Sequence, residues 1–314
     1  MPNTFLTAQL IARQALPMLQ SNMVMPFLVY RNYENEFKKQ GDTIQVRKPA
    51  VFVADEFGGT INLQEVGEGQ VLVTLNKIAD VSVELTSKEL TLNVEDFNQQ
   101  ILAPATLAIA EKVNRDILGL YTDIPYHAGT SGTTPNSLDT FANARTVLDN
   151  NKVPLATRRA VWNADANAKL SIIPAIVNAE KSGTTLALRE GSMGRVGGLD
   201  NYMAQSVFTH VSGGYTALAD VKVTATKGAT TITMESTAGA STASLKKGDI
   251  FILGGYQYVV TENTAAAAAG DIASVKIYPA IQADVSAGDV TFPDRTAGAH
   301  AANLAFHESA FCLA

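Results

Sequence analysis

Short runs of alternating apolar residues, separated by turns, fill residues 215–293 and constrain the fold of this chain more than any other feature. The apolar residues recur at every second position, as in strands with one buried face: Val221 and Val223; Ile232 and Met234; Phe251 and Leu253; Tyr256, Tyr258 and Val260; Val275 and Ile277; Val290 and Phe292. Glycine-containing turns lie between these runs. This spacing predicts a small β-barrel or sandwich. The alanine run 265–269 lies between turn signals, and we expect it to belong to a loop despite its helical propensity.

A long helix is predicted over residues 95–121. One helical face carries its larger apolar residues, which are Leu102, Ile109, Val113, Ile117 and Leu120. Pro104 should kink this helix or mark a second start, because proline removes a helical hydrogen bond. This is the longest regular element that the pattern predicts.

Two segments before this helix bury little surface by themselves. Residues 4–19 have apolar residues at helical spacing and indicate an amphipathic helical arm. Residues 41–86 alternate with the period of a strand at 44–46, 71–75 and 81–85, around a glycine-rich stretch at 58–70. We interpret this region as a long two-stranded hairpin with an extended tip. An isolated hairpin is barely stable in water, so this one needs another surface to lie across.

The segments after the long helix alternate between helix and strand. We expect helices over 141–149 and 164–172, a strand over 159–162, and a glycine-rich turn followed by a strand within 186–207. The last segment, 300–314, reads as a strand that returns to this lobe. The predicted fold class is therefore α+β, with the barrel inserted into a larger domain.

Composition narrows the function classes. The net charge is −6 and only 17% of residues are charged, which argues against tight, specific binding of nucleic acid. Cys312 is the only cysteine, so an intramolecular disulfide and a cysteine metal cluster are both excluded. We see neither an apolar run of membrane-spanning length nor a signal peptide, and we expect no membrane partner.

The sequence offers no catalytic, cofactor-binding or metal-ligating set that we would assign. The four histidines, His127, His210, His300 and His307, lack ligand partners at useful spacing, and a packing or surface role is expected for them. The stretch 191–198 fits no phosphate-binding motif and indicates a tight turn. No GxSxG nucleophile elbow occurs.

The charged clusters of the sequence indicate surface, not a catalytic site. The carboxylate pairs Glu34 and Glu36, and Asp55 and Glu56, lie in polar surroundings and indicate solvated surface. The basic pairs Arg158-Arg159 and Lys246-Lys247 indicate solvated faces or contacts between subunits. We therefore expect no enzyme activity.

Three stretches carry a family resemblance. They are LVYRNYENEFKKQGDTIQVRKP at 28–49, LREGSMGRVGGLDNYMAQSV at 188–207 and NLAFHESAFCLA at 303–314. In their order and spacing they resemble the major capsid proteins of tailed bacteriophages, which have the Hong Kong 97-type fold. Within this family the sequence is similar to the branch of the phage P-twenty-two coat protein, which carries an inserted β-barrel. Leu199 stands where an aromatic residue is common in that family.

The resemblance implies a subunit that assembles with copies of itself, as hexamers and pentamers, into an icosahedral shell around double-stranded DNA. It also implies a separate scaffolding protein, a portal, non-specific contact with the packaged DNA, and assembly in the bacterial cytoplasm before residence in the virion. The family's parts map onto this chain as follows: N-terminal arm 1–40, extended hairpin loop 41–86, spine helix and peripheral domain 87–125, axial-type α+β lobe 126–214, inserted barrel 215–293 and returning strand 294–314.

Some relatives join subunits covalently through a lysine in the extended loop. Residues 57–70 contain no lysine, so we expect no such bond here. Three alternatives remain: a nanocompartment shell protein of the same fold, for which a cargo enzyme would copurify; a tail or decoration protein, which the long helix disfavours; and an enzyme, for which no residue set was found.

Overall fold

The structure is a computed structural model that describes residues 23–31, 43–47, 69–75, 77–82, 101–183, 185–236, 242–265, 267–268, 270–293 and 298–313. The helix predicted at 4–19, most of the loop at 58–70, and the carboxylate pairs at 34–36 and 55–56 lie outside these residues. So do residues 95–100 of the predicted long helix.

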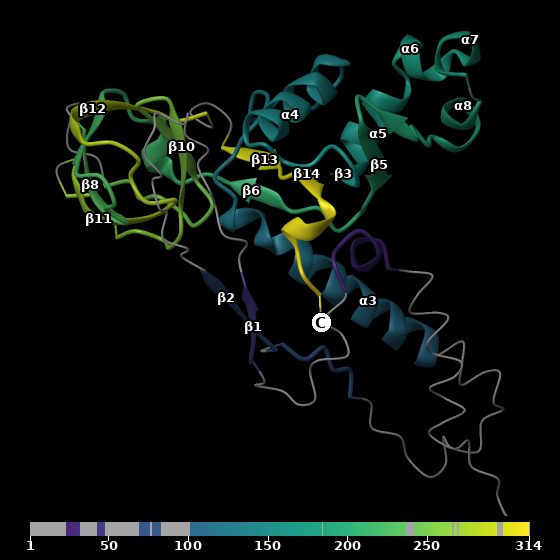
Figure 1. Ribbon diagram of the computed structural model, residues 1–314, viewed down its shortest axis with the longest axis horizontal. Helices are drawn as coiled ribbons and strands as arrows, with labels where there is room; N and C mark the ends of the chain where they lie inside the picture. The colour runs from purple at the N-terminus through teal and green to yellow at the C-terminus, as the bar shows by residue number, and fades with distance from the viewer. Residues whose placement is uncertain are drawn as a thin grey trace, which may run out of the picture.

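Six strands form a closed barrel, which confirms the prediction from the alternating pattern (Figure 1). They are β7 Val221–Ala225, β8 Thr231–Ser236, β9 Ile250–Leu253, β10 Tyr256–Val260, β11 Ile272–Tyr278 and β12 Val285–Thr291. The order around the barrel is β10-β11-β8-β7-β12-β9, and every neighbouring pair is antiparallel. Closure pairs both edges of each strand, which leaves the barrel without an open sheet edge.

The barrel encloses a core of its own. Strand β8 alternates exposed and buried residues along its whole length, as the period of a one-sided strand requires. Phe251 is fully buried and its ring stacks on Tyr258 with 5.4 Å between the centroids. The described residues of the run 265–269 form no helix, and Ala268 makes only an isolated bridge to Asp271. The expected loop is therefore confirmed for those residues.

A second lobe is built on a four-stranded sheet of order β14-β3-β5-β4. Its strands are β3 Arg158–Trp162, β4 Arg195–Val196, β5 Leu199–Met203 and β14 Leu304–His307. β14 pairs antiparallel with β3, so the final segment does return to this lobe as predicted. β5 pairs parallel with β3. The crossover between them carries all the described helices of the lobe except the first, which precedes β3.

The described helices of the lobe are α4 Asp139–Asn150, α5 Ala164–Ser171, α6 Pro174–Val177, α7 Ala179–Ser182 and α8 Leu186–Glu190. α4 and α5 match the helices predicted at 141–149 and 164–172. Asn163 caps α5, because its side-chain oxygen accepts a hydrogen bond from the N–H of Ala166 at 3.1 Å. Phe141 of α4 packs edge-on against Trp162 of β3 in the core of this lobe.

Within the described residues, the α-helical part of the predicted long helix begins next to the proline, after two residues in π-helical conformation at 101–102. α3 spans Ala103–Leu118 with Pro104 in its first turn, where a missing N–H costs nothing. It passes at Gly119 into the short 3-10 helix η4 Gly119–Asp123. Leu120, predicted on the same helical face as Ile117, lies in η4 and is 39% exposed, whereas Ile117 is buried. The buried stripe of α3 runs through Ala110, Asn114 and Ile117.

Both chain ends of the described structure pack on this helix, which we call the spine. The 3-10 helix η1 Met25–Phe27 contacts α3, and Asn114 accepts hydrogen bonds from the backbone N–H groups of Val24 and Met25 at 3.3 and 3.1 Å. Tyr30 forms a parallel bridge with Cys312. The short 3-10 helix η6 Glu308–Ala310 precedes this contact.

The predicted hairpin is present as an antiparallel pair, β1 Thr43–Arg47 with β2 Gln70–Thr74, in the register Thr43 to Thr74. In Figure 1 this ribbon lies apart from the sheet of the lobe. Residues 77–82 form no strand, so the predicted second alternation is wrong at Val81; Val83 and Leu85 lie outside the described residues.

Two short strands join the barrel to the rest of the molecule. β6 Thr209–Val211 leads into the barrel through the 3-10 helix η5 Gly214–Ala217, and β13 Ala299–Ala301 leads out of it. The two strands pair antiparallel, with His210 opposite His300. The ends of the 215–293 segment therefore lie side by side, as an insertion requires. We call this pair of strands the stem.

Candidate functional site

The four histidines lie in three places, and the structure gives each a hydrogen-bonding or packing role. His307 ends β14 and bonds to Thr157 and Ser309. The ring of His127 bonds to Ser131 at 3.2 Å, while its backbone N–H donates to Oε1 of Gln257 in the barrel at 2.8 Å. His210 and His300 face each other in the stem. Among the described residues, no group of three or more His, Cys, Asp or Glu side chains could hold a metal ion.

The glycine-rich stretch 191–198 contains the short strand β4 and a tight turn at 197–198, so the predicted turn is confirmed only for these last two residues. Gly191 ends α8 in the left-handed conformation, with φ of +67°. Gly197 also has a positive φ, and a Cβ there would lie 3.0 Å from the Cβ of Phe141. Glycine is therefore needed at position 197 for both backbone conformation and packing against α4.

The basic pair Arg158-Arg159 is not a solvated face, which corrects one of the two roles expected from sequence; the other, a contact between subunits, stays a prediction. Arg158 is only 2% exposed, and its guanidinium donates to Asp149 and to the carbonyl groups of Val153 and Pro154. Arg159 is mostly buried and pairs with Glu308 at 3.2 Å. Both arginines lie on the central strand β3, where the neighbouring strands and loops remove them from water.

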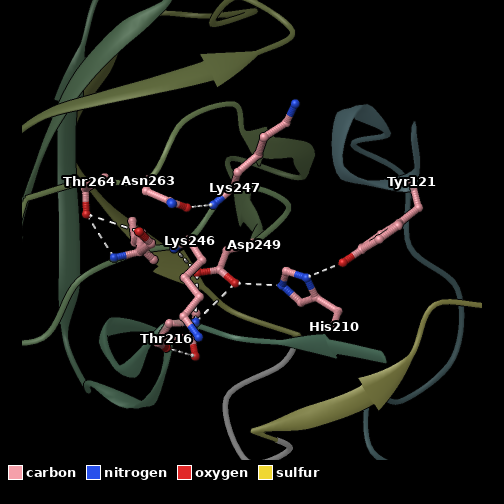
Figure 2. Close-up of polar contacts among 10 residues, drawn as sticks. Tyr121, His210, Thr216, Lys246, Lys247, Asp249, Asn263 and Thr264 are labelled. Carbon is pink, nitrogen blue, oxygen red and sulfur yellow. Dashed lines mark hydrogen bonds and ion pairs between the residues drawn. The ribbon is translucent and has the colours of Figure 1, made fainter. Parts of the chain in front are cut away.

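The polar junction between barrel and spine is the most organised cluster in the described structure, and the sequence did not predict it (Figure 2). Nε2 of His210 lies 3.0 Å from Oδ1 of Asp249, and Nδ1 lies 3.0 Å from the hydroxyl of Tyr121. Tyr121 comes from η4, His210 from β6 and Asp249 from the turn before β9. His210 is 5% exposed and Asp249 is fully buried.

Two backbone groups complete the environment of Asp249. Its carboxylate accepts from the N–H of Gly213 at 3.1 Å and from the N–H of Lys246 at 2.7 Å. A buried carboxylate is tolerated only with such donors. Burial raises the pKa of the Tyr121 hydroxyl, and the charge of Asp249 raises it further, so this tyrosine stays protonated at neutral pH. Tyr121, His210 and Asp249 are far apart in the sequence, so their spacing could not predict that they form a cluster.

The base of the hairpin is anchored to the spine through charge. Nζ of Lys77 lies 3.6 Å from Oδ1 of Asp116 on α3, and Lys112 pairs with the same carboxylate at 2.7 Å. The hydrogen bond from Lys112 lowers the pKa of Asp116; burial opposes that shift and the charge of Lys77 adds to it. Leu72 on the ribbon and Ile78 in the segment after it are exposed, at 58% and 65%.

A groove of about 990 Å³ lies between residues 126–137, helix α4 and strand β14. Its lining is mixed in polarity and includes Ser, Thr and Asn side chains as well as Trp162. His127 and Ser131 border it, and both belong to the same loop, so we assign their hydrogen bond to the structure of that loop. Within the residues described, no helix combines the length and apolar character that a membrane crossing requires.

Comparisons with known proteins give similarities in structure only. No protein-family model matches the sequence, and no curated protein matches it. Among solved structures, one from Mycobacterium phage Che8 is 15% identical, with 86% of this chain and 90% of that chain covered and a TM-score of 0.49. The capsid structure of the cyanophage P-SCSP1u is 12% identical, with 89% and 87% covered and a TM-score of 0.46.

The mature capsid of bacteriophage PhiM1 is a third similar structure. It is 10% identical, with 81% of each chain covered and a TM-score of 0.38. All three TM-scores are below 0.5. We therefore base the assignment to the α+β class, with a closed six-stranded barrel, on the helices and strands described above and not on these similarities.

Proposed function

We propose that this chain is the major capsid protein of a tailed bacteriophage, with a Hong Kong 97-type fold and an inserted barrel over residues 215–293. In this role it is a structural subunit without enzyme activity. It would assemble as hexamers and pentamers in the host cytoplasm, with a scaffolding protein and a portal, and then form the virion shell around double-stranded DNA.

One observation carries the proposal: a two-stranded ribbon leaves apolar side chains in solvent. β1 and β2 pair only with each other among the described strands. Leu72 on this ribbon is 58% exposed. A ribbon of this kind is marginal alone, and the surface of a neighbouring copy would cover its apolar residues. Weak contacts of this kind add up when they repeat around a closed ring.

The order of elements supports the same assignment. The ribbon, the spine, an α+β lobe and a final strand that returns to that lobe follow one another as the three resembling stretches suggest. The barrel is inserted between β6 and β13 without interrupting the sheet of the lobe. A low net charge per residue also suits a surface that packs against copies of itself.

The test is assembly of the purified chain, followed by electron microscopy and sedimentation velocity. We expect closed shells, or capsomers that close when scaffolding protein is supplied. A chain that remains a stable monomer under both conditions would contradict the proposal. A shell that copurifies with one cargo enzyme instead of with scaffold would favour the nanocompartment alternative.

A matched pair of variants on the ribbon sharpens this test. Leu72 lies directly opposite Gln45 in the β1–β2 register, so both side chains are on one face. Leu72→Asp adds one negative charge and removes the apolar surface, whereas Gln45→Glu adds the same charge beside it and leaves that surface in place. We expect Leu72→Asp to stop assembly and Gln45→Glu to permit it. Equal assembly by both variants would exclude the ribbon as a contact.

A further inference from the structure

The barrel is packed as a separate body. The described structure contains three clusters of buried apolar residues, and the barrel cluster shares no residue with the other two. All of its members lie between Tyr215 and Phe292. The position of the barrel relative to the spine is therefore set by contacts outside any shared core.

The covalent connection to the barrel is narrow. The chain enters and leaves through the stem, whose two strands are each three residues long. Beyond the paired strands, the N–H of Ser212 donates to the carbonyl of Gly298 at 2.8 Å. A two-stranded ribbon has little resistance to bending and twisting, so the stem can serve as a pivot.

The barrel meets the rest of the molecule through several contacts. β10 contacts η4 and carries the fully buried Val259, and Gln257 of β10 accepts a hydrogen bond from the N–H of His127 at 2.8 Å.

The polar contacts at the spine end involve the stem. His210 of the stem contacts Asp249 of the barrel on one side and Tyr121 of the spine end on the other, with both distances 3.0 Å (Figure 2). Beside them, Nζ of Lys247 lies 2.9 Å from Oδ1 of Asp123. Lys247 and Asp123 are 43% and 50% exposed, so this outer ion pair is screened and contributes little.

The donor and acceptor groups determine the direction of the two hydrogen bonds between Tyr121, His210 and Asp249. An ionised Asp249 can only accept hydrogen bonds, so Nε2 of His210 donates to it. In the neutral ring, Nδ1 then accepts from the hydroxyl of Tyr121. The ring of His300, opposite His210 in the stem, lies with its centroid 5.3 Å from that of His210. Each hydrogen bond requires a narrow range of distance and angle. A small displacement of the barrel therefore breaks the hydrogen bonds between Tyr121, His210 and Asp249.

A glycine permits this close approach. Gly248 precedes Asp249 and has φ of +96°. A Cβ at this position would lie 3.0 Å from Cε1 of His210 and 3.2 Å from Cγ2 of Thr122. The turn of the barrel thus fits against both the stem and the end of the spine.

We propose that the barrel is a rigid body that can pivot on the β6–β13 stem, and that the Tyr121–His210–Asp249 chain is the latch that holds it against the spine. Because the barrel has its own core and is held by specific hydrogen bonds, we expect two arrangements of the barrel relative to the spine, docked and displaced, and not a continuous range of positions. This inference concerns the single subunit and does not depend on the proposed function.

The test is a distance measurement between spin labels on the unassembled full-length chain. Cys312→Ser removes the only cysteine of the sequence. Labels then go on Glu111→Cys in α3 and on Asp289→Cys in β12, both exposed positions. In this background we expect one narrow distance distribution, which represents the docked barrel.

Two variants break the latch and one serves as control. Tyr121→Phe removes only the hydroxyl that contacts His210, while His210→Ala removes both contacts. Tyr258→Phe removes a buried hydroxyl inside the barrel, which accepts from the N–H of Gln282 at 3.2 Å. We expect Tyr121→Phe to raise the displaced population about fivefold, the factor that one typical hydrogen bond provides, and His210→Ala to raise it further. Tyr258→Phe should leave the distribution unchanged.

Circular dichroism of each variant verifies that the strands remain folded. If His210→Ala does not fold, the conservative Tyr121→Phe variant alone tests whether the latch holds the barrel. The proposal is overturned if Tyr121→Phe retains the narrow distribution of the parent chain. It is also overturned if Tyr258→Phe broadens the distribution as much as Tyr121→Phe does, because the latch would then have no special role.

Discussion

Nη1 of Arg158 lies 2.7 Å from Oδ1 of Asp149, and this contact joins the first residue of β3 to the last turn of α4. The arginine is buried while the aspartate is 41% exposed, so the pair spans the boundary between the lobe and solvent. The remaining donors of Arg158 bond to the carbonyl groups of Val153 and Pro154. One side chain therefore closes the loop between helix and strand.

Replacing Arg158 should destabilise the lobe. Arg158→Met leaves the carbonyl groups of Val153 and Pro154 without this donor, and we expect a loss of about 1–3 kcal/mol in the free energy of unfolding. Trp162 is the only tryptophan and lies in the core of this lobe, so its fluorescence during urea unfolding reports the effect. Arg145→Met is the control: Arg145 contacts the same aspartate but is 50% exposed, so we expect a much smaller loss. Equal losses would show that the buried contacts of Arg158 are unimportant.

The same pair should make the lobe sensitive to acid. The hydrogen bond from Arg158 is the main cause that lowers the pKa of Asp149 below its ordinary value of 3.8. A lowered pKa in the folded state stabilises the protein above the ordinary value, and this stabilisation is lost as pH falls through the folded value. Asp149→Asn should therefore reduce the melting temperature at pH 7, and the difference from the parent should shrink below about pH 4. A difference that stays constant over this range would contradict the role of the charge.

The barrel should fold as a semi-independent unit. An excised fragment of residues 215–293 is expected to be soluble and rich in strand by circular dichroism, because its core lies within the fragment. Phe251→Asp should unfold it, since an unpaired carboxylate in that core costs several kcal/mol, a large part of the stability of a small domain. Lys246→Ala should fold normally, because only the backbone of Lys246 supports the turn and its side chain is exposed. A disordered parent fragment would show that the barrel depends on the rest of the chain.

Mature shells should contain no covalent bonds between subunits through the extended loop. Residues 57–70 contain no lysine, so the nucleophile that such a bond requires is missing there. Subunits from assembled shells should therefore run as a single monomer band on a denaturing gel. A ladder of oligomers that survives denaturation would refute this prediction.

Asn114 should hold the segment before η1 on the spine. Asn114→Ala removes the acceptor for the N–H groups of Val24 and Met25, and we expect residues 23–31 to exchange amide hydrogens several-fold faster. Asn143→Ala, on an exposed position of α4, is the matched control and should leave exchange at 23–31 unchanged. Unchanged exchange in Asn114→Ala would mean that apolar contacts alone hold the segment.

The sequence by itself determined those elements whose residues interact with near neighbours along the chain. Alternation identified the barrel strands, and helical periodicity identified α4, α5 and most of α3, because each pattern records which face is buried. Glycine spacing located the turn at 197–198, although the strand β4 occupies part of the predicted stretch 191–198. The return of the final segment to the lobe was also correctly predicted, and β14 pairs with β3 there.

Only the tertiary structure decided which polar groups meet. Tyr121, His210 and Asp249 come from three separate elements, so no spacing in the sequence brings them together. Arg158 was misread because two adjacent arginines usually indicate a solvated face, whereas here the central position of β3 buries them. Burial of a polar side chain depends on partners that are distant in sequence, and local pattern contains no information about those partners.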